Sequence, residues 1–176
     1  MGLRDLVERT LVEVRLSAGI PERRERIVVA DFIAEVQVAA VIEAAVRDLQ
    51  FTVAPVEEGL AAEGDRQILA AAVANVLQNA VTFTQARGSV SLNAYSVADR
   101  IVIGVEDECG GLPDGNVEEI FRPFEQLGSE RTGLGLGLSI SRRGIEANGG
   151  KLYVRNIPGT GCGFTIDLPR AAALFW

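Results

Sequence analysis

Two β-hairpin patterns constrain the fold of this chain more than any other feature. Residues 89–97 and 100–108 are strand-like runs on either side of a two-residue turn. Residues 151–157 and 163–169 form a second such pair around a turn that contains proline, threonine and two glycines. Helical patterns lie before and between the hairpins. The chain is therefore predicted to fold as an α/β two-layer sandwich, with one mixed sheet and helices on one face.

Residues 63–84 form the strongest helical pattern. Their apolar residues recur at steps of three and four and form one stripe: Leu69, Val73, Val76, Ala80 and Phe83. A β-branched run predicts a strand over residues 26–33, an alanine-rich segment predicts a helix over 34–50, and a strand follows over 50–56. Glycines open one more helix, over residues 135–148.

The domain organisation follows from these elements. Residues 26–170 are expected to form one domain, which suits a chain of 176 residues. We expect residues 1–16 to form a short amphipathic helix, residues 17–25 a charged linker and residues 171–176 a tail. The irregular stretch at 109–133 is rich in glycine and charge, and a loop of that length in a compact domain usually serves function.

Composition excludes several classes of function. The chain has no histidine, which excludes an imidazole base, a histidine metal ligand and a phosphohistidine within these residues. A net charge of −7 argues against a dedicated nucleic-acid binder. With only two cysteines, Cys109 and Cys162, a zinc site is not expected; two reduced thiols are favoured, and one disulfide stays open. No apolar stretch approaches the length of a membrane span, and no signal peptide is evident, so we expect a soluble intracellular protein.

Two asparagines on the strongest helix are candidates for a cation site. Asn75 and Asn79 are four residues apart, so they lie beside each other at the edge of the apolar stripe. Amide oxygens there suit Mg²⁺, which keeps several waters and shares phosphate oxygens. The alternative is that both residues simply flank a core face.

A carboxylate at the end of a predicted strand is the second candidate. Asp107 lies in the run Val-Glu-Asp-Glu-Cys-Gly-Gly-Leu-Pro. It can accept a hydrogen bond from a ligand amine, while the following glycines let the backbone come close. An acidic turn without a ligand is the alternative.

A glycine run and a pair of aromatics complete the candidates. Gly133, Gly135 and Gly137 alternate with leucine before a helix, where backbone N–H groups and the helix N-terminus attract an anion. The run matches neither a P-loop nor a dinucleotide-binding fingerprint. Phe121 and Phe124 lie inside the irregular stretch, and they either anchor a lid or belong to the core.

These four motifs, in this order, resemble the catalytic and ATP-binding domain of bacterial sensor histidine kinases. The matching segments are NVLQNAVTFT, VEDECGGLP, IFRPFEQ and RTGLGLGLSISRRGIEANGG, ending in GTGCGFTIDLP. The resemblance covers about residues 26–170 and extends to the ATPase superfamily of DNA gyrase B, Hsp90 and MutL. It implies a Bergerat-type fold with a mostly antiparallel sheet. The opening RTLVEVRL resembles the end of the second helix of the kinase dimerisation domain.

The resemblance implies a role for each motif. Asn79 would bind Mg²⁺ and Asn75 would support it near the phosphates of ATP, so both count as catalytic residues. Asp107 would accept the adenine amino group, and Gly111 would let the backbone pass close to the base. The triphosphate would be lined by Gly133, Gly135, Leu136 and Gly137.

The implied ATP lid spans residues 112–132. Phe121 and Phe124 would secure it. Arg122 and Arg131 are the candidates for a mobile cation near the γ-phosphate, and Arg131 is the one we take as catalytic.

Several positions depart from the family pattern. Thr82 stands where a lysine is usual, which removes one phosphate contact and predicts weaker nucleotide binding. Cys109, Leu134 and Cys162 replace a more common glycine, a Thr or Ser, and a Thr. An anti-sigma-factor serine kinase is disfavoured, because Asn75 stands where hydrolytic and related members carry a carboxylate base.

The resemblance also implies partners. Because this chain has no histidine, the phosphoryl acceptor would be a histidine on a dimerisation domain, in a homodimeric full-length protein, with a response regulator downstream. It implies a cytoplasmic domain, free or attached to a membrane-anchored kinase, with no membrane insertion of its own. The alternative is a pseudokinase that serves as an interaction module with weak or no nucleotide binding.

Overall fold

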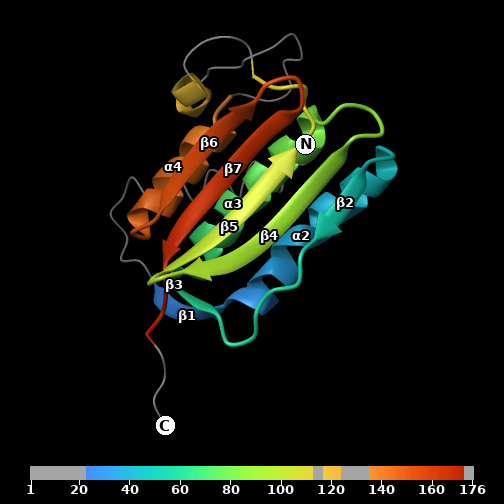
Figure 1. The fold of residues 1–176 in the computed structure, drawn as a ribbon. Helices are drawn as coiled ribbons and strands as arrows, with labels where there is room; N and C mark the ends of the chain where they lie inside the picture. The colour runs from blue at the N-terminus through green and yellow to red at the C-terminus, as the bar shows by residue number, and fades with distance from the viewer. Residues whose placement is uncertain (1–22, 113–116, 124–134, 173–176) are drawn as a thin grey trace.

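The computed structural model describes residues 23–112, 117–123 and 135–172. They form two layers, with a five-stranded sheet in front of three helices and a two-stranded sheet at its lower end (Figure 1). The helices are α2 (Val29–Val46), α3 (Arg66–Phe83), the short 3₁₀-helix η1 (Val117–Phe121) and α4 (Gly137–Ala147). The strands are β1 (Arg24–Val28), β2 (Gln50–Val53), β3 (Ala61–Asp65), β4 (Ser89–Val97), β5 (Arg100–Asp107), β6 (Lys151–Ile157) and β7 (Gly161–Pro169).

The large sheet has the strand order β2-β4-β5-β7-β6. β2 pairs with β4 in parallel, and the other three pairs are antiparallel. β4–β5 and β6–β7 are the two predicted hairpins, and β5 joins them by pairing with β7. The predicted two-layer sandwich with a mixed, mostly antiparallel sheet is confirmed.

One row of side chains shows how the sheet faces the helices. Ala94, Ile103, Ile166 and Leu152 are register partners on β4, β5, β7 and β6, and none is more than 5% exposed. Side chains alternate between the two faces of a strand. The next residue along β4, Tyr95, therefore faces away from the helices and is 47% exposed.

The apolar stripe of α3 is confirmed for four of its five predicted residues. The four that are fully buried are Leu69, Val73, Val76 and Ala80. The prediction is wrong for Phe83, which is 40% exposed. α3 ends at Phe83, and Val81 occupies the buried position of the last turn instead.

Several boundaries differ from the sequence prediction. The helix expected over residues 34–50 spans Val29–Val46, and the strand expected over 50–56 ends at Val53. The strand predicted over residues 26–33 ends at Val28, because apolar residues at helical spacing from Val29 to Ala44 bury one face of α2. That burial outweighs the β propensity of the segment. β3 was not expected, since residues 63–65 were assigned to the following helix. Asp65 instead caps α3, and its side chain accepts the N–H groups of Gln67 and Ile68.

The ends of the predicted domain are only partly described. β1 includes residues 24–25, the last two of the expected linker. Residues 1–16, residues 17–22 of that linker and residues 173–176 of the tail lie outside the described residues. Within the described part of the chain, no helix is both long and apolar enough to cross a membrane.

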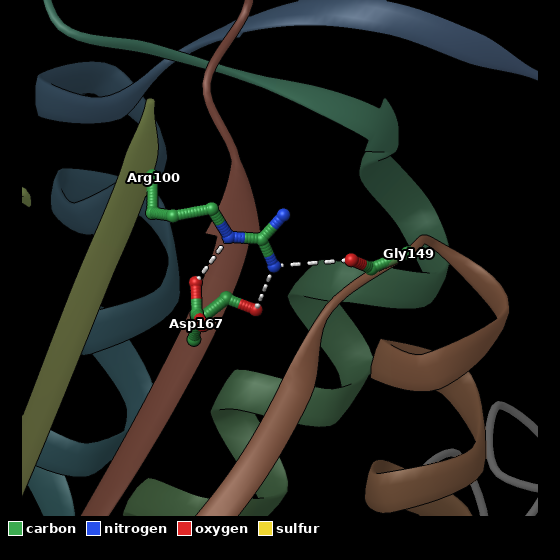
Figure 2. Close-up of polar contacts among 3 residues, drawn as sticks. All are labelled: Arg100, Gly149 and Asp167. Carbon is green, nitrogen blue, oxygen red and sulfur yellow. Dashed lines mark hydrogen bonds and ion pairs between the residues drawn. The ribbon is translucent and has the colours of Figure 1, made fainter. Parts of the chain in front are cut away.

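Polar contacts join the sheet to α4 at the end where β5 begins (Figure 2). Arg100 Nε donates to Asp167 Oδ1 on β7 at 2.6 Å, and its Nη2 donates to the carbonyl oxygen of Gly149 at 3.1 Å. Nearby, Asn148 is fully buried, and its Oδ1 accepts the N–H of Asp65 at 2.6 Å. The motif residues lie toward the opposite end of the sheet, where β5 ends.

Candidate functional site

The asparagine motif and the glycine run meet where α3 packs on α4. Asn75 is 7% exposed, and its Nδ2 donates to Ser141 Oγ at 2.9 Å. A Cβ on Gly137 would lie 2.7 Å from the amide atoms of Asn75. Only glycine at the first residue of α4 allows so close an approach. The structure therefore brings together two motifs that are some sixty residues apart in the sequence.

Asn79 is held differently from Asn75. Its Nδ2 donates to the carbonyl oxygen of Asn75 at 2.9 Å, one turn earlier in α3. Because the amide nitrogen is engaged, Oδ1 is the atom that Asn79 presents to a ligand. Among the described residues, that oxygen accepts no hydrogen bond.

An uncharged residue, Thr82, occupies the position where the family usually has a lysine. Thr82 Oγ1 accepts a hydrogen bond from Gln78 Nε2 at 3.3 Å, and the same nitrogen donates to Glu43 on α2 at 2.6 Å. Thr82 supplies no positive charge, so the predicted loss of one phosphate contact stands as an expectation.

Asp107 is buried at the end of β5. It is 5% exposed, and its Oδ1 accepts the backbone N–H groups of Cys109 and Cys162, each at 3.0 Å. Burial raises the pKa of Asp107, and the hydrogen bonds from Cys109 and Cys162 oppose that rise. One oxygen is thus fixed by two donors, which orients the other as an acceptor.

Two glycines let backbone segments come close together around the end of β5. A Cβ on Gly161 would lie 1.7 Å from the backbone oxygen of Asp107. Gly111 has a φ of +94°, a conformation that favours glycine. The next residue, Leu112, donates its N–H to Asn156 Oδ1 on β6 at 2.8 Å. Gly161 and Asn156 were not among the predicted site residues, although Gly161 lies in the quoted glycine-rich turn.

The two cysteines lie beside Asp107. Both are free thiols, and their Sγ atoms are 3.1 Å apart. Cys109 is half-buried and Cys162 is 2% exposed. The sequence left the pairing of these two residues open, and the structure makes them neighbours, 53 positions apart in the chain, as free thiols.

The start of α4 carries the described part of the glycine run. Gly135 has a φ of +66°, and Leu136 precedes the helix without a side-chain cap. Ser139 Oγ donates to the Leu136 carbonyl at 2.8 Å. Gly133 lies outside the described residues. The first N–H groups of α4 are therefore of the kind that bind anions at helix starts.

Phe121 is the last residue of η1 and is buried, at 6% exposure. The guanidinium of Arg142 on α4 lies over its ring, 4.6 Å from the centroid. Arg142 also pairs with Glu118 at 2.5 Å and with Glu146 at 3.2 Å. Arg142 thus fixes η1 on α4, and no local pattern in the sequence indicated this role, because Glu118 is 24 residues away along the chain.

Other predicted lid residues contribute less to the described site. Arg122 is exposed and pairs with Glu119 at 3.3 Å, and among the described residues no contact of Arg122 indicates the phosphate role we expected. Phe124 and Arg131 lie outside the described residues.

The candidate residues gather at one end of the sandwich. Figure 1 shows the end of β5 at the same end of the molecule as the end of α3 and the start of α4. The chain after α3 contacts the chain after β5, because Gln85 donates its N–H to the carbonyl oxygen of Glu108 at 3.0 Å. The fold thus places the Asp107 carboxylate, the amides of Asn75 and Asn79 and the start of α4 at the same end of the sandwich.

A protein-family model and curated proteins match this chain. Residues 64–172 match the family described as histidine kinase-, DNA gyrase B-, and HSP90-like ATPase. The alginate biosynthesis sensor protein KinB of Pseudomonas aeruginosa is 37% identical over 105 residues, which are 60% of this chain and 18% of KinB. The signal transduction histidine-protein kinase AtoS of Escherichia coli is 32% identical over 170 residues, which are 96% of this chain and 23% of AtoS. The chain thus spans less than a quarter of these relatives.

Solved structures share the fold. Full-length ShkA in complex with AMPPNP superposes with a TM-score of 0.82 at 28% identity, covering 96% of this chain and 36% of that one. The catalytic domain of histidine kinase ThkA superposes with a TM-score of 0.75 at 27% identity, covering 84% of this chain and 96% of that one.

Proposed function

Since the chain belongs to the family of histidine kinase-, DNA gyrase B- and HSP90-like ATPases, we propose that it is the ATP-binding catalytic domain of a sensor histidine kinase. It presents Mg-ATP for phosphoryl transfer to a histidine that these 176 residues do not contain. KinB, named as a sensor protein, AtoS, named as a histidine-protein kinase, and the ShkA complex with AMPPNP support this proposal. Catalysis of this kind depends on positioning and on neutralising phosphate charge.

The observation that carries the proposal is the orientation of Asp107. Two backbone N–H groups engage Oδ1, so Oδ2 is directed as an acceptor for a ligand amine. We assign that ligand as the amino group of adenine. The positive φ of Gly111 and the tight contact at Gly161 keep the surrounding backbone close enough to enclose a flat base.

The described amides fit a magnesium ion shared with phosphates. Mg²⁺ prefers oxygen ligands and usually takes only one or two from protein. Asn79 is the protein ligand in this proposal, because its nitrogen is already engaged and its Oδ1 is the free end of the amide. When bound, Mg²⁺ would neutralise charge on the phosphate oxygens. Asn75 positions Asn79 through its backbone carbonyl, and Gly135, Leu136 and Gly137 offer N–H groups to the phosphates.

An amide at Asn75 favours transfer over hydrolysis. Its Nδ2 donates to Ser141 Oγ, and an amide does not accept a proton near neutral pH. Water in the site would therefore lack a general base. We expect slow ATP hydrolysis in the absence of an acceptor domain, and turnover near one per second would contradict the assignment.

The partners follow from the proposed reaction. The acceptor would be a histidine on a dimerisation domain of the same full-length protein, acting as a homodimer, with a response regulator receiving the phosphoryl group. Such a domain would work in the cytoplasm.

Titration calorimetry with AMPPNP, with and without Mg²⁺, tests the nucleotide site. Asn79→Ala should abolish the gain in affinity that Mg²⁺ provides, while Gln78→Ala, one residue away, should keep it. Equal Mg²⁺ dependence in both variants would exclude Asn79 as the ligand. Transfer of label from ATP to an added histidine-bearing dimerisation domain of the full-length parent then tests the reaction.

The second candidate is an interaction module without nucleotide chemistry. The uncharged Thr82, at the position where a lysine is usual, favours it. Failure of the protein to bind AMPPNP at millimolar concentration would support this candidate over the kinase.

A further inference from the structure

The fold creates a contact between the only two cysteines of the chain. Cys109 follows β5, two residues beyond Asp107, and Cys162 lies on β7 as the register partner of Asp107. The sulphur atoms are 3.1 Å apart. Both residues also donate their backbone N–H groups to Asp107 Oδ1, so the thiol pair and the carboxylate form one cluster.

The two thiols have different surroundings. Cys162 is buried in a strand paired on both sides, with Asp107 and with Asn156. Cys109 is half-buried in the loop after β5. The hydrogen bond between the thiols lowers the pKa of Cys109 and raises that of Cys162. Cys109 is thus both the more accessible of the two thiols and the one that ionises more readily.

We propose that Cys109 and Cys162 form a redox-active dithiol that closes to an intramolecular disulfide on oxidation by a peroxide, and that this closure weakens nucleotide binding at Asp107. The second half of this proposal rests on the function proposed above. Disulfides that form transiently in reducing compartments are typically catalytic or redox-sensing.

The chemistry balances in two steps. The Cys109 sulphur attacks one oxygen of hydrogen peroxide, the O–O bond breaks, and one water leaves with the Cys109 proton, giving a sulfenic acid. The Cys162 sulphur then attacks the Cys109 sulphur, the S–O bond breaks, and a second water leaves with the Cys162 proton. One peroxide gains two electrons, and the two thiols lose them.

Closure acts on Asp107 through the loop. A disulfide bond is about 2.05 Å long, so the two sulphurs must approach by about 1 Å. Cys162 is fixed by strand pairing on both sides, so Cys109 has to move. Its N–H is one of the two donors to Asp107 Oδ1, and Gly110 and Gly111 follow it directly. Movement of Cys109 therefore weakens one of the two hydrogen bonds that orient the Asp107 carboxylate.

Thiol counting tests the closure. The reduced 176-residue protein is treated with hydrogen peroxide under native conditions, quenched, labelled with maleimide and weighed by intact mass spectrometry. We expect both thiols to disappear together in a monomer that has lost the mass of two hydrogens. Two remaining thiols, oxidation of one thiol alone, or disulfide-linked dimers would overturn the proposal.

Matched variants assign the two roles. Cys162→Ser should stop at a sulfenic acid on Cys109 that dimedone traps. Cys109→Ser should leave a buried thiol that reacts at least about tenfold more slowly with peroxide. Comparable rates in the two variants would refute the assignment of Cys109 as the attacking residue. The wild-type count requires neither variant to fold.

Calorimetry on the reduced and oxidised protein tests the effect on the nucleotide. Loss of one hydrogen bond corresponds to about fivefold weaker AMPPNP binding after oxidation. By linkage, saturating AMPPNP should shift the dithiol–disulfide equilibrium in glutathione buffers toward the dithiol by the same factor. Equal affinities in the two states would overturn the coupling. No binding by the reduced protein would overturn the proposed function, while the thiol count would still decide the disulfide.

Discussion

Asp107→Asn tests the base contact because the structure determines which way the new amide points. The backbone N–H groups of Cys109 and Cys162 both lie 3.0 Å from Oδ1 of Asp107. The asparagine oxygen must keep that position, because the NH₂ group would face two donors in the other orientation. The NH₂ group therefore takes the place of Oδ2. In that position the NH₂ group faces the adenine amino group, and because both groups are donors, no hydrogen bond forms between them.

The expected loss follows from that geometry. A hydrogen bond to a charged group contributes about 1.5 to 3 kcal/mol. AMPPNP affinity should therefore fall by roughly 10- to 140-fold. An inosine nucleotide carries an oxygen in place of the amino group and can accept from the new NH₂. The ratio of affinities should accordingly shift toward the inosine nucleotide in the variant.

The same substitution should not destabilise the fold at neutral pH. Burial raises the pKa of Asp107 above its ordinary value of 3.8, so the folded state binds a proton more tightly than the unfolded state. The free energy of unfolding then declines as the pH rises through the raised pKa. At pH 7 the ionised carboxylate is unfavourable for stability, and a neutral asparagine removes that penalty. Acid should also weaken nucleotide binding, beginning above pH 3.8.

Titration calorimetry and thermal melts at pH 7 measure both effects. Glu106→Gln is the matched control, because Glu106 precedes Asp107 on β5, faces the other side of the sheet and pairs with the exposed Arg155. We expect it to bind AMPPNP as the wild type does. Unchanged AMPPNP affinity in Asp107→Asn, with a melting temperature at least equal to wild type, would refute the adenine assignment.

Three further predictions concern the structure around the site. Gly161→Ala should lower the free energy of unfolding by more than about 2 kcal/mol, because the new Cβ would lie 1.7 Å from a backbone oxygen of β5. The control Gly159→Ala has open space around its Cβ but a φ of +73°, and it should lower the free energy of unfolding by about 1 kcal/mol. Urea titration of both variants measures the difference. Asn148→Ala should cost about 2 to 4 kcal/mol in the same titration, because it leaves two buried backbone groups without partners, and a loss below 1 kcal/mol would contradict this. Arg142→Gln should lower the free energy of unfolding by less than about 1 kcal/mol, because the Arg142 side chain is one-third exposed. The same variant should exchange the backbone amide hydrogens around Phe121 faster than the wild type does. Unchanged exchange there would show that the stacked guanidinium does not hold η1 on α4.

The elements that could be predicted are those whose pattern is local. The hairpins β4–β5 and β6–β7 agree with their predicted ranges to within two residues, and four of the five predicted residues on the buried face of α3 are correct. Strand runs, tight turns and helical spacing can be recognised from neighbouring residues. β3 could not be predicted, because Ala61–Asp65 has weak strand propensity and becomes a strand by pairing with β1. Phe83 was predicted to be buried because the spacing of apolar residues does not show where a helix ends, and α3 ends at Phe83.

The residues of the candidate site were readable from the sequence by type, since amides, a carboxylate before glycines and a glycine-opened helix each carry a chemistry of their own. The contacts between them were decided by the tertiary structure alone. Gly137 touches Asn75, and Cys109 touches Cys162, only because α3 packs on α4 and β5 pairs with β7. Such contacts join residues far apart in the chain, and their geometry depends on how whole elements bury their apolar faces. No local pattern contains that information.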